Sequence, residues 1–326
     1  QGEAFGINIP GYTFNLATEI TGSVDFINKN LAPKDKQCHL FFWSGIADPS
    51  AEAVALTYKN KLLNINGDSD THIDYHHTSL TGIRPMGLQV GDYYQVFAPI
   101  EMDFYFMNGF SGPLYGFENV IQTLELTNTP RRTKPIDIYY HIYSAGFPGS
   151  LKAIEKVYRW ALQQSVMNIF ISDYIKKVLD YYQTIIGRKN DSWLIYTNGD
   201  LRELRSPNAL GYPNLLNSHN VIGFKENKDD LYIHLGPGRF TQLDYQKEKP
   251  KLPYLVEANA RVTKFLRTPN QLMVQFQGYM PLEFTFANVS NCQIFSQSPL
   301  KVTNNSDKTI SYNSKERSDE IHFNCR

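Results

Sequence analysis

The chain has 326 residues, which is long enough for two domains with separate hydrophobic cores. Its 32 basic and 32 acidic residues leave no net charge, which argues against nucleic acid or an anionic membrane surface as the partner. No apolar run approaches the roughly 20 residues that span a bilayer, so we expect no membrane span. Residues 1–20 lack the form of a signal peptide and look like the interior of a larger protein.

The first half of the chain alternates predicted helices and strands. Apolar residues recur at helical spacing between Thr13 and Leu31, and Pro49 to Lys61 is a second predicted helix. Further helices are predicted at 117–126, after the loop 142–149, and from Ser172 to Ile186. Five strands are predicted: His39–Trp43, Leu62–Asn66, Tyr93–Pro99, Ile136–His141 and Asn168–Ile171.

This alternation is typical of parallel βα units. A closed barrel of such units needs about eight strands, and the chain opens with a helix that has no strand before it. We therefore expect residues 1–187 to be the C-terminal part of an incomplete (β/α) barrel. An open five-stranded sheet is the alternative.

Residues 188–326 have a different pattern of predicted secondary structure, and the predicted domain boundary lies near 187–191. Short alternating strands follow one another between turns, without a helix-length apolar stripe, which indicates an antiparallel β-sandwich. The predicted strands are Trp193–Thr197, Leu231–Leu235, Tyr254–Val256, Gln271–Gln277, Leu282–Phe286, Gln293–Phe295 and Ile310–Tyr312. Cys292 and Cys325 lie in this region and could form a disulfide, which would suit an oxidising compartment, whereas Cys38 would stay free.

His141 is the first candidate functional residue. In the predicted strand Ile136–His141, side chains alternate, so Asp137, Tyr139 and His141 share one face. His141 ends the strand where a loop begins, and active sites of parallel α/β proteins are built at the carboxyl ends of strands. A purely structural histidine is the alternative.

Carboxylates follow two of the predicted strands. Asp68 and Asp70 come after Leu62–Asn66, and Asp70 could accept the ring N–H of His141. Glu101 and Asp103 come after Tyr93–Pro99 and could serve as a glycosidase acid/base pair. Capping of the loops is the simpler role for all four.

The loop from Asp70 to His77 contains several metal-capable side chains. Its spacing matches no standard zinc signature, so a solvated or loop-packing role is expected.

Several motifs together resemble one known family. They are IPGYTFNLATEITGSVDFINKNLAP, LFFWSG, LLNINGDSDTHI, YQVFAPI, SGPLYGFENVIQTLELTNTPRR and KPIDIYYHIYSAGFPGSLKAIEKVYRWAL. Over residues 9–187 the chain resembles the deacetylase region of PelA-type proteins, which modify the Pel exopolysaccharide of bacterial biofilms. The C-terminal region is similar to the β-sandwich that follows this deacetylase, through NGDLRELRSP, ALGYPN and LYIHL.

The resemblance implies a NodB-like deformed barrel that removes N-acetyl groups from an amino-sugar polymer with one divalent metal ion, zinc or cobalt. It assigns His141 as the histidine that protonates the departing amine, and Asp70, with Asp68 second, as its orienting carboxylate. Trp43 to Gly45 occupy the position of the family's R-x-P-Y motif, which frames the substrate, but the arginine is missing. Trp43, Ser44, Asp68 and Tyr139 are the expected substrate-binding residues.

The metal ligands of the family lie in an aspartate-rich motif and an H-x-x-x-H motif upstream of the region that matches Ile9. This chain contains neither motif, so the ligands are expected upstream of it. His72 and His76 have the fitting spacing, but they lie in the wrong strand for the family's site.

The resemblance also implies a periplasmic or secreted location, a polysaccharide substrate, and other exopolysaccharide export or modification proteins as partners. Two other functions stay open: a non-catalytic polysaccharide-binding or scaffold module, and a glycoside hydrolase that uses Glu101 and Asp103.

Overall fold

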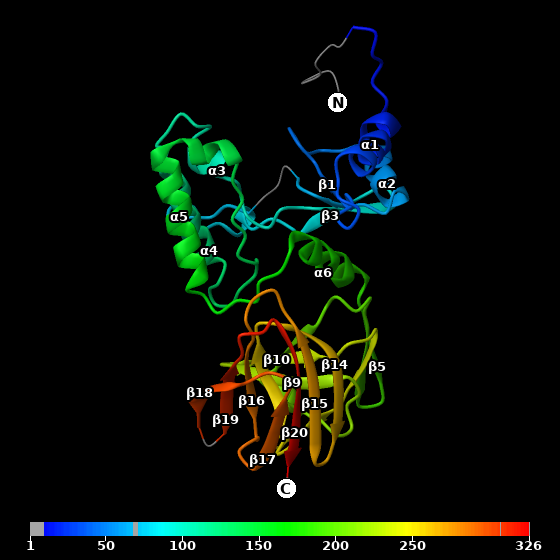
Figure 1. Ribbon diagram of the computed structural model, residues 1–326, viewed down its shortest axis with the longest axis vertical. Helices are drawn as coiled ribbons and strands as arrows, with labels where there is room; N and C mark the ends of the chain where they lie inside the picture. Colours follow the sequence, from blue (N-terminus) through cyan, green and yellow to red (C-terminus); the bar gives the residue numbers. More distant parts are fainter. Residues whose placement is uncertain (1–9, 68–70, 307, 326) are drawn as a thin grey trace. The chain divides into compact units, whose positions relative to one another are not determined.

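The computed structural model describes residues 10–67, 71–306 and 308–325. The chain divides into two compact units, residues 1–165 and 166–326 (Figure 1). The sequence had placed the boundary after the predicted helix that ends at Ile186. Instead, this helix, α6 (Ile171–Gln183), belongs to the second unit. Its buried Asp180 explains why, because the carboxylate accepts the backbone N–H groups of Asn198, Asp200 and Leu201.

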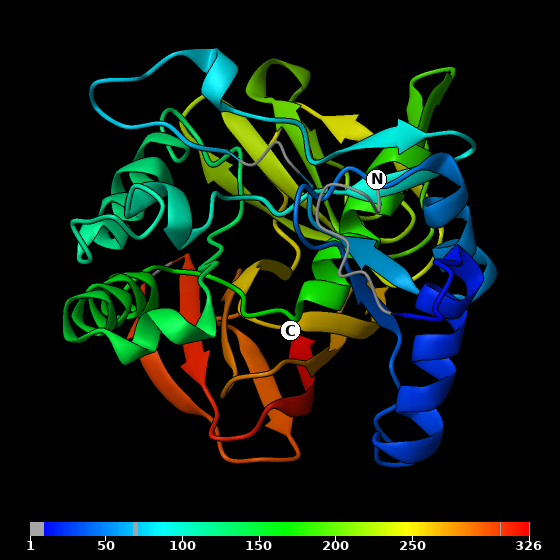
Figure 2. The same cartoon turned by 90° about the horizontal axis from the view of Figure 1, so that it is seen from above.

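The first part of unit 1 places helices beside a short strand pair. A π-helical turn, η1 (Thr18–Gly22), leads into α1 (Ser23–Asn30), and α2 (Ala51–Lys59) begins after Ser50, whose hydroxyl accepts from Ala53 N–H. The strands are β1 (Leu40–Phe42), β2 (Leu63–Ile65), β3 (Gly87–Val90) and β4 (Tyr93–Val96). β1 and β2 are parallel, whereas β3 and β4 form an antiparallel hairpin. In both views α1 and α2 lie beside β1 (Figures 1 and 2).

The second part of unit 1 is helical. Its elements, after the turn η2 (Leu80–Gly82), are α3 (Asp103–Phe106), η3 (Gly116–Asn119), α4 (Val120–Leu126), η4 (Ile142–Gly146) and α5 (Pro148–Leu162). Apolar side chains of α4 and α5 form one buried cluster, and Ile136, Ile138 and Tyr140 pack against it. The predicted alternation over 136–141 is therefore present on this face.

Two predicted strands are absent from the structure. Residues 136–141 form no strand ladder, because the backbone groups of Tyr139 and His141 are bonded to Asp103 rather than to a neighbouring strand. Residues 168–170 are irregular, and Ile171 already begins α6. In the described part of unit 1, the strands form two separate pairs, and a NodB-like barrel is not seen.

Unit 2 is built from antiparallel strands, as the sequence predicted. Each of the seven predicted strands overlaps an observed one; Gln271–Gln277 coincides with β15 in full. The bounds are β5 Ile185–Lys189, β6 Ser192–Tyr196, β7 Glu203–Pro207, η5 Asn208–Leu210, β8 Tyr212–Pro213, β9 Val221–Asn227, β10 Asp230–Leu235, β11 Phe240–Leu243, β12 Tyr245–Gln246, β13 Tyr254–Ala258, β14 Arg261–Thr268, β15 Gln271–Gln277, β16 Glu283–Ala287, β17 Cys292–Ser296, β18 Lys301–Asn305, β19 Thr309–Asn313 and β20 Ser318–Cys325.

The two main sheets of unit 2 share a core, which makes a sandwich. One sheet has the order β18-β19-β16-β13-β9-β10-β7 and the other β14-β15-β20-β17. Neighbours are antiparallel except β9 and β13, which are parallel. Aromatic rings from both sheets meet in the core, among them Phe284 and Phe286 of β16 and Phe276 of β15. Smaller sheets, β11-β6-β5 and β12-β8, complete the unit.

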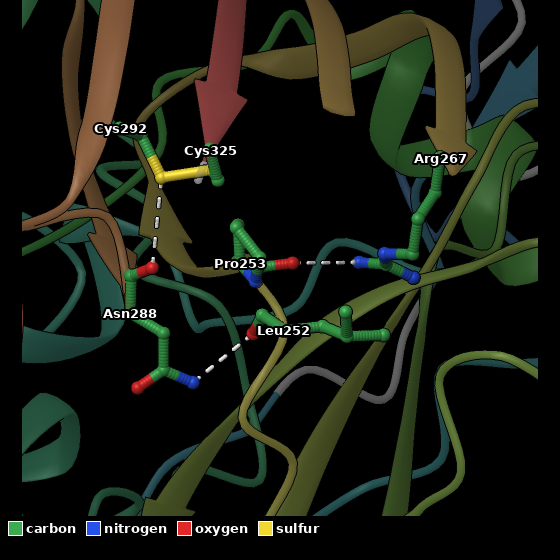
Figure 3. The surroundings of a disulfide bond; sticks show 6 residues. All are labelled: Leu252, Pro253, Arg267, Asn288, Cys292 and Cys325. Carbon is green, nitrogen blue, oxygen red and sulfur yellow. Dashed lines mark hydrogen bonds between the residues drawn. A yellow bond between two sulfur atoms is a disulfide. The ribbon is translucent and has the colours of Figure 1, made fainter. Parts of the chain in front are cut away.

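A disulfide joins Cys292 to Cys325, as proposed from the sequence, and Cys38 is free. The two cysteines are opposite each other in the β17–β20 ladder. Nearby, the Asn288 amide donates to Leu252 O and the Arg267 guanidinium donates to Pro253 O (Figure 3). Arg267 also donates to the carbonyls of Val221 and Ile222, so this buried cation is bound by main-chain oxygens.

Candidate active site

His141 is bonded to a buried carboxylate. Its Nδ1 lies 2.7 Å from Oδ1 of Asp103, which is the first residue of α3. The imidazole is 32% exposed, whereas the Asp103 side chain is fully buried. A carboxylate at Nδ1 favours the tautomer that carries the proton there, so Nε2 is the ring nitrogen left for a substrate.

Asp103 is held in place from several sides. Its Oδ2 accepts the backbone N–H of His141 at 3.1 Å and the hydroxyl of Ser144, and its own N–H donates to Tyr139 O at 3.1 Å. These bonds tie α3 to the segment that runs into η4, and they fix both the imidazole and its carboxylate. Buried polar groups need such partners, and here they also define the geometry of the His141–Asp103 pair.

Aromatic rings surround the imidazole. Tyr143 and Tyr139 are stacked with it, at centroid distances of 4.9 and 6.4 Å, and Phe110 meets it edge-on at 5.9 Å. Phe110 has a left-handed backbone, with φ of 64°. A bulky residue is rarely found there, and residues held in this way cluster at functional sites.

Asn66, just after β2, connects two of the predicted substrate-binding residues. Its side-chain N–H groups donate to Trp43 O at 2.8 Å and to the Tyr139 hydroxyl at 3.1 Å. The backbone of Asn66 is left-handed, with φ of 91°, and its buried Oδ1 has no partner among the described residues. The ends of β1 and β2 are thereby linked to the residue that stacks with His141.

The predicted residues have different surroundings. Tyr139 is half-buried beside His141, and Ser44 is exposed. The Trp43 ring is buried in the core of unit 1 with its N–H on Asn64 Oδ1, so little of its surface is left for a sugar. Asp68 and Asp70 lie outside the described residues. The carboxylate seen on His141 is that of Asp103.

The described histidines of the loop, His72, His76 and His77, are exposed. His77 Nδ1 contacts both carboxylate oxygens of Asp74, at 3.1 and 3.2 Å, and His76 N–H donates to the same carboxylate. His72 contacts Phe106 edge-on, and desolvation by burial lowers the pKa of His72.

The resemblance implies a resident divalent metal ion. Across residues 10–67, 71–306 and 308–325, no three His, Cys, Asp or Glu side chains lie together in a way that could hold a metal ion. The described residues alone therefore do not form the divalent metal site that the resemblance implies.

Two further carboxyl groups in unit 1 are strongly desolvated. Burial raises the pKa of Glu101 to about 7, although the bonded Met102 N–H and the charge of Arg84 oppose this rise. Burial likewise raises the pKa of Asp137 to about 7, against the hydrogen bond from Ile138 N–H. Such shifts are frequent at functional sites, and they also occur in structural cores.

Two residues of this site, Asn66 and Ser144, were not predicted from the sequence, and neither was the contact of Asp103 with His141. The sequence indicated Asp103 only as a carboxylate beyond a strand, paired with Glu101 for glycoside hydrolysis.

None of the helices in the described parts of the chain is long and apolar enough to cross a membrane. In comparisons with protein-family models, curated proteins and solved structures, nothing matched the chain.

Proposed function

We propose that this chain takes part in the hydrolytic N-deacetylation of an amino-sugar polysaccharide, with His141 as the proton donor. The observation that carries this proposal is the His141–Asp103 pair: a part-exposed imidazole whose Nδ1 is held by a fully buried carboxylate. That arrangement fixes the orientation of the ring and holds Nδ1, which leaves Nε2 to face a substrate.

The chemistry assigned to the pair is one proton transfer. In amide hydrolysis, the oxygen of water bonds to the acetyl carbon, the carbon–nitrogen bond breaks, and the departing nitrogen takes up a proton. His141 would give that proton from Nε2 while Asp103 accepts the Nδ1 hydrogen bond. The products are acetate and a free amino sugar. In the family that the sequence resembles, a bound metal ion would supply the activation of water; His141 and Asp103 supply the proton-donating side.

Two other features support the proposal. The aromatic rings around His141 suit sugar rings, since tyrosine and phenylalanine offer flat apolar faces. The Cys292–Cys325 disulfide suits an oxidising compartment such as the periplasm or the cell exterior, where exopolysaccharides are modified. We also propose a NodB-like barrel as the fold of the catalytic domain.

A glycoside hydrolase that uses Glu101 and Asp103 is disfavoured by their surroundings. Asp103 is buried and bonded to His141 and Ser144, and Glu101 is 8% exposed with Oε1 on Met102 N–H. Acid/base carboxylates of glycosidases must reach both sides of a glycosidic bond. The aromatic surroundings of His141 do favour a second candidate, a polysaccharide-binding module without chemistry.

Product analysis distinguishes these functions. The full-length protein is incubated with an N-acetylated hexosamine polymer, and released acetate and new reducing ends are both measured. A deacetylase releases acetate without new reducing ends. New reducing ends without acetate would overturn the proposal in favour of glycoside hydrolysis. If neither product forms, the proposal is overturned in favour of a polysaccharide-binding module without catalysis.

A further inference from the structure

Unit 1 carries a connected series of aromatic rings that reaches well beyond His141. Six side chains join the imidazole through successive ring contacts, and we name them the aromatic strip: Phe42, Tyr139, Tyr143, Phe110, Phe104 and Tyr105.

The contacts run away from His141 along two routes. One passes through Tyr139 to Phe42 of β1, whose centroids are 5.9 Å apart. The other passes through Tyr143 to Phe110 at 5.2 Å, and from there to Phe104 of α3 at 5.4 Å. His141 therefore lies in the middle of the series, which draws its members from separate chain segments.

Much of the strip is accessible. Phe42, Phe104, Tyr105 and Tyr143 are between 40% and 55% exposed. Single exposed aromatic residues are ordinary, but a connected group of them on one folded unit marks a binding surface.

The chain segments that carry most of the strip are uncharged. Neither 104–117 nor 138–151 contains an aspartate, glutamate, lysine or arginine. A surface for nucleic acid or phosphate needs cations, and protein interfaces are typically rimmed by charged and polar groups. Aromatic faces without charge match a neutral ligand with both apolar C–H faces and hydroxyl groups.

We propose that the aromatic strip binds several consecutive units of a neutral, N-acetylated polysaccharide and presents one acetamido group to His141. The binding part follows from the strip itself, whereas the event at His141 rests on the proposed function. Because the rings extend on two routes from the imidazole, the substrate is the interior of a polymer rather than a single sugar or a chain end.

Binding measurements with oligosaccharides of increasing length test this inference. Calorimetric titration of the protein with N-acetylhexosamine oligomers of two and six units is predicted to show clearly tighter binding of the longer one. Phe104→Ala and Tyr143→Ala should each weaken binding of the six-unit oligomer about three- to tenfold, the loss expected when one stacked ring is removed. Thermal unfolding checks that the fold is intact.

Phe26→Ala is the matched control, because Phe26 is 59% exposed on α1 of the same unit but lies outside the strip. Its six-unit affinity should equal that of the parent. The inference is overturned if the two oligomers bind equally, or if Phe26→Ala loses as much affinity as the strip variants.

The two proposals fail in different ways. If the six-unit oligomer binds tightly through Phe104 but the full-length protein releases no acetate, the deacetylase proposal is contradicted. The aromatic strip is then still supported as a polysaccharide-binding surface. Acetate release with unchanged affinity in Phe104→Ala and Tyr143→Ala contradicts the strip alone.

Discussion

Asp103 is the residue on which the geometry of the candidate site depends most. It joins α3 to the segment before η4 through bonds to His141, Ser144 and Tyr139. A carboxylate that holds the second nitrogen of a catalytic histidine sets both its orientation and its tautomer.

Replacing Asp103 by asparagine should therefore impair His141 without removing it. We expect acetate release to fall by about 10- to 100-fold, the usual loss when an orienting partner is removed. Nitrogen NMR of the imidazole should show a changed proton distribution between Nδ1 and Nε2. Asp25→Asn, at an exposed position on α1 of the same unit, serves as control and should leave both readouts unchanged. An unchanged imidazole spectrum in Asp103→Asn would refute the orienting role.

Glu101 makes stability depend on pH in a defined direction. Its pKa is raised from 4.5 to about 7, so between these values the folded state binds more protons than the unfolded state. The resulting stability is fully present below about pH 4.5 and is lost as the pH rises through 7. A rise of this size corresponds to roughly 3 kcal/mol.

Glu101→Gln should remove this contribution, because an amide does not titrate. Relative to the parent, the variant should gain stability on going from pH 5 to pH 8, as measured by urea unfolding at each pH. Asp137 contributes in the same direction, so part of the pH dependence should persist in the variant. Exposed Glu52, replaced by glutamine, is the control. Parallel curves for parent and Glu101→Gln would show that the carboxyl group is not desolvated.

At the residue scale, the sequence indicated both members of the His141–Asp103 pair but not their contact. The position of His141 at the end of an alternating segment was readable, and so was Asp103 as a carboxylate beyond a strand. Their contact spans 38 residues and depends on the fold between them, which no local pattern encodes. The buried position of Trp43 was equally hidden, since a short apolar run is compatible with a core or a substrate role.

At the scale of elements, short apolar runs predicted strands well where a partner strand exists. β2 and β15 fall within predicted strands, and most of their apolar residues are buried. β1 and β4 also fall within predicted strands, although Phe42 and Tyr93 are exposed. Residues 136–141 show the same alternation, but their backbone groups form hydrogen bonds with Asp103 rather than with a neighbouring strand. The pattern therefore predicted burial but not strand pairing. β18 was missed because all of its residues are exposed.

The disulfide is the element-scale feature with the clearest energetic consequence. Cys292 and Cys325 are 33 residues apart, and closing a loop of that length stabilises the folded state by about 3 to 4 kcal/mol through chain entropy. The Cys292→Ser, Cys325→Ser double variant should lose about that much in urea unfolding of unit 2. Cys38→Ser, which removes the free cysteine of unit 1, should leave the transition of unit 2 unchanged. Equal stability of the double variant and the parent would contradict a structural disulfide.

The whole molecule consists of two units with cores of their own, formed by separate groups of buried residues. Separate cores allow separate unfolding. The change from alternating helices and strands to short strands predicted this division and the β-sandwich. It placed the boundary after α6 rather than before it. The apolar stripe of α6 predicts that the helix packs against another element, whereas its bonds to unit 2, among them those of Asp180, Lys177 and Asp173, show where it belongs.

Calorimetry should accordingly resolve two unfolding transitions, of which only one responds to reduction of the disulfide. Residues 166–326 expressed alone should reproduce that transition, because α6 and all the strands of the sandwich are included. A single transition that shifts as a whole on reduction would contradict two independent units.

The measurement that tests the account most directly is acetate release by His141→Gln in the full-length protein acting on an N-acetylated hexosamine polymer. A general acid contributes about 100-fold or more, so release should fall by at least that factor while thermal stability and polymer affinity stay at parental values. Parental rates of acetate release in a folded His141→Gln protein would contradict the central claim.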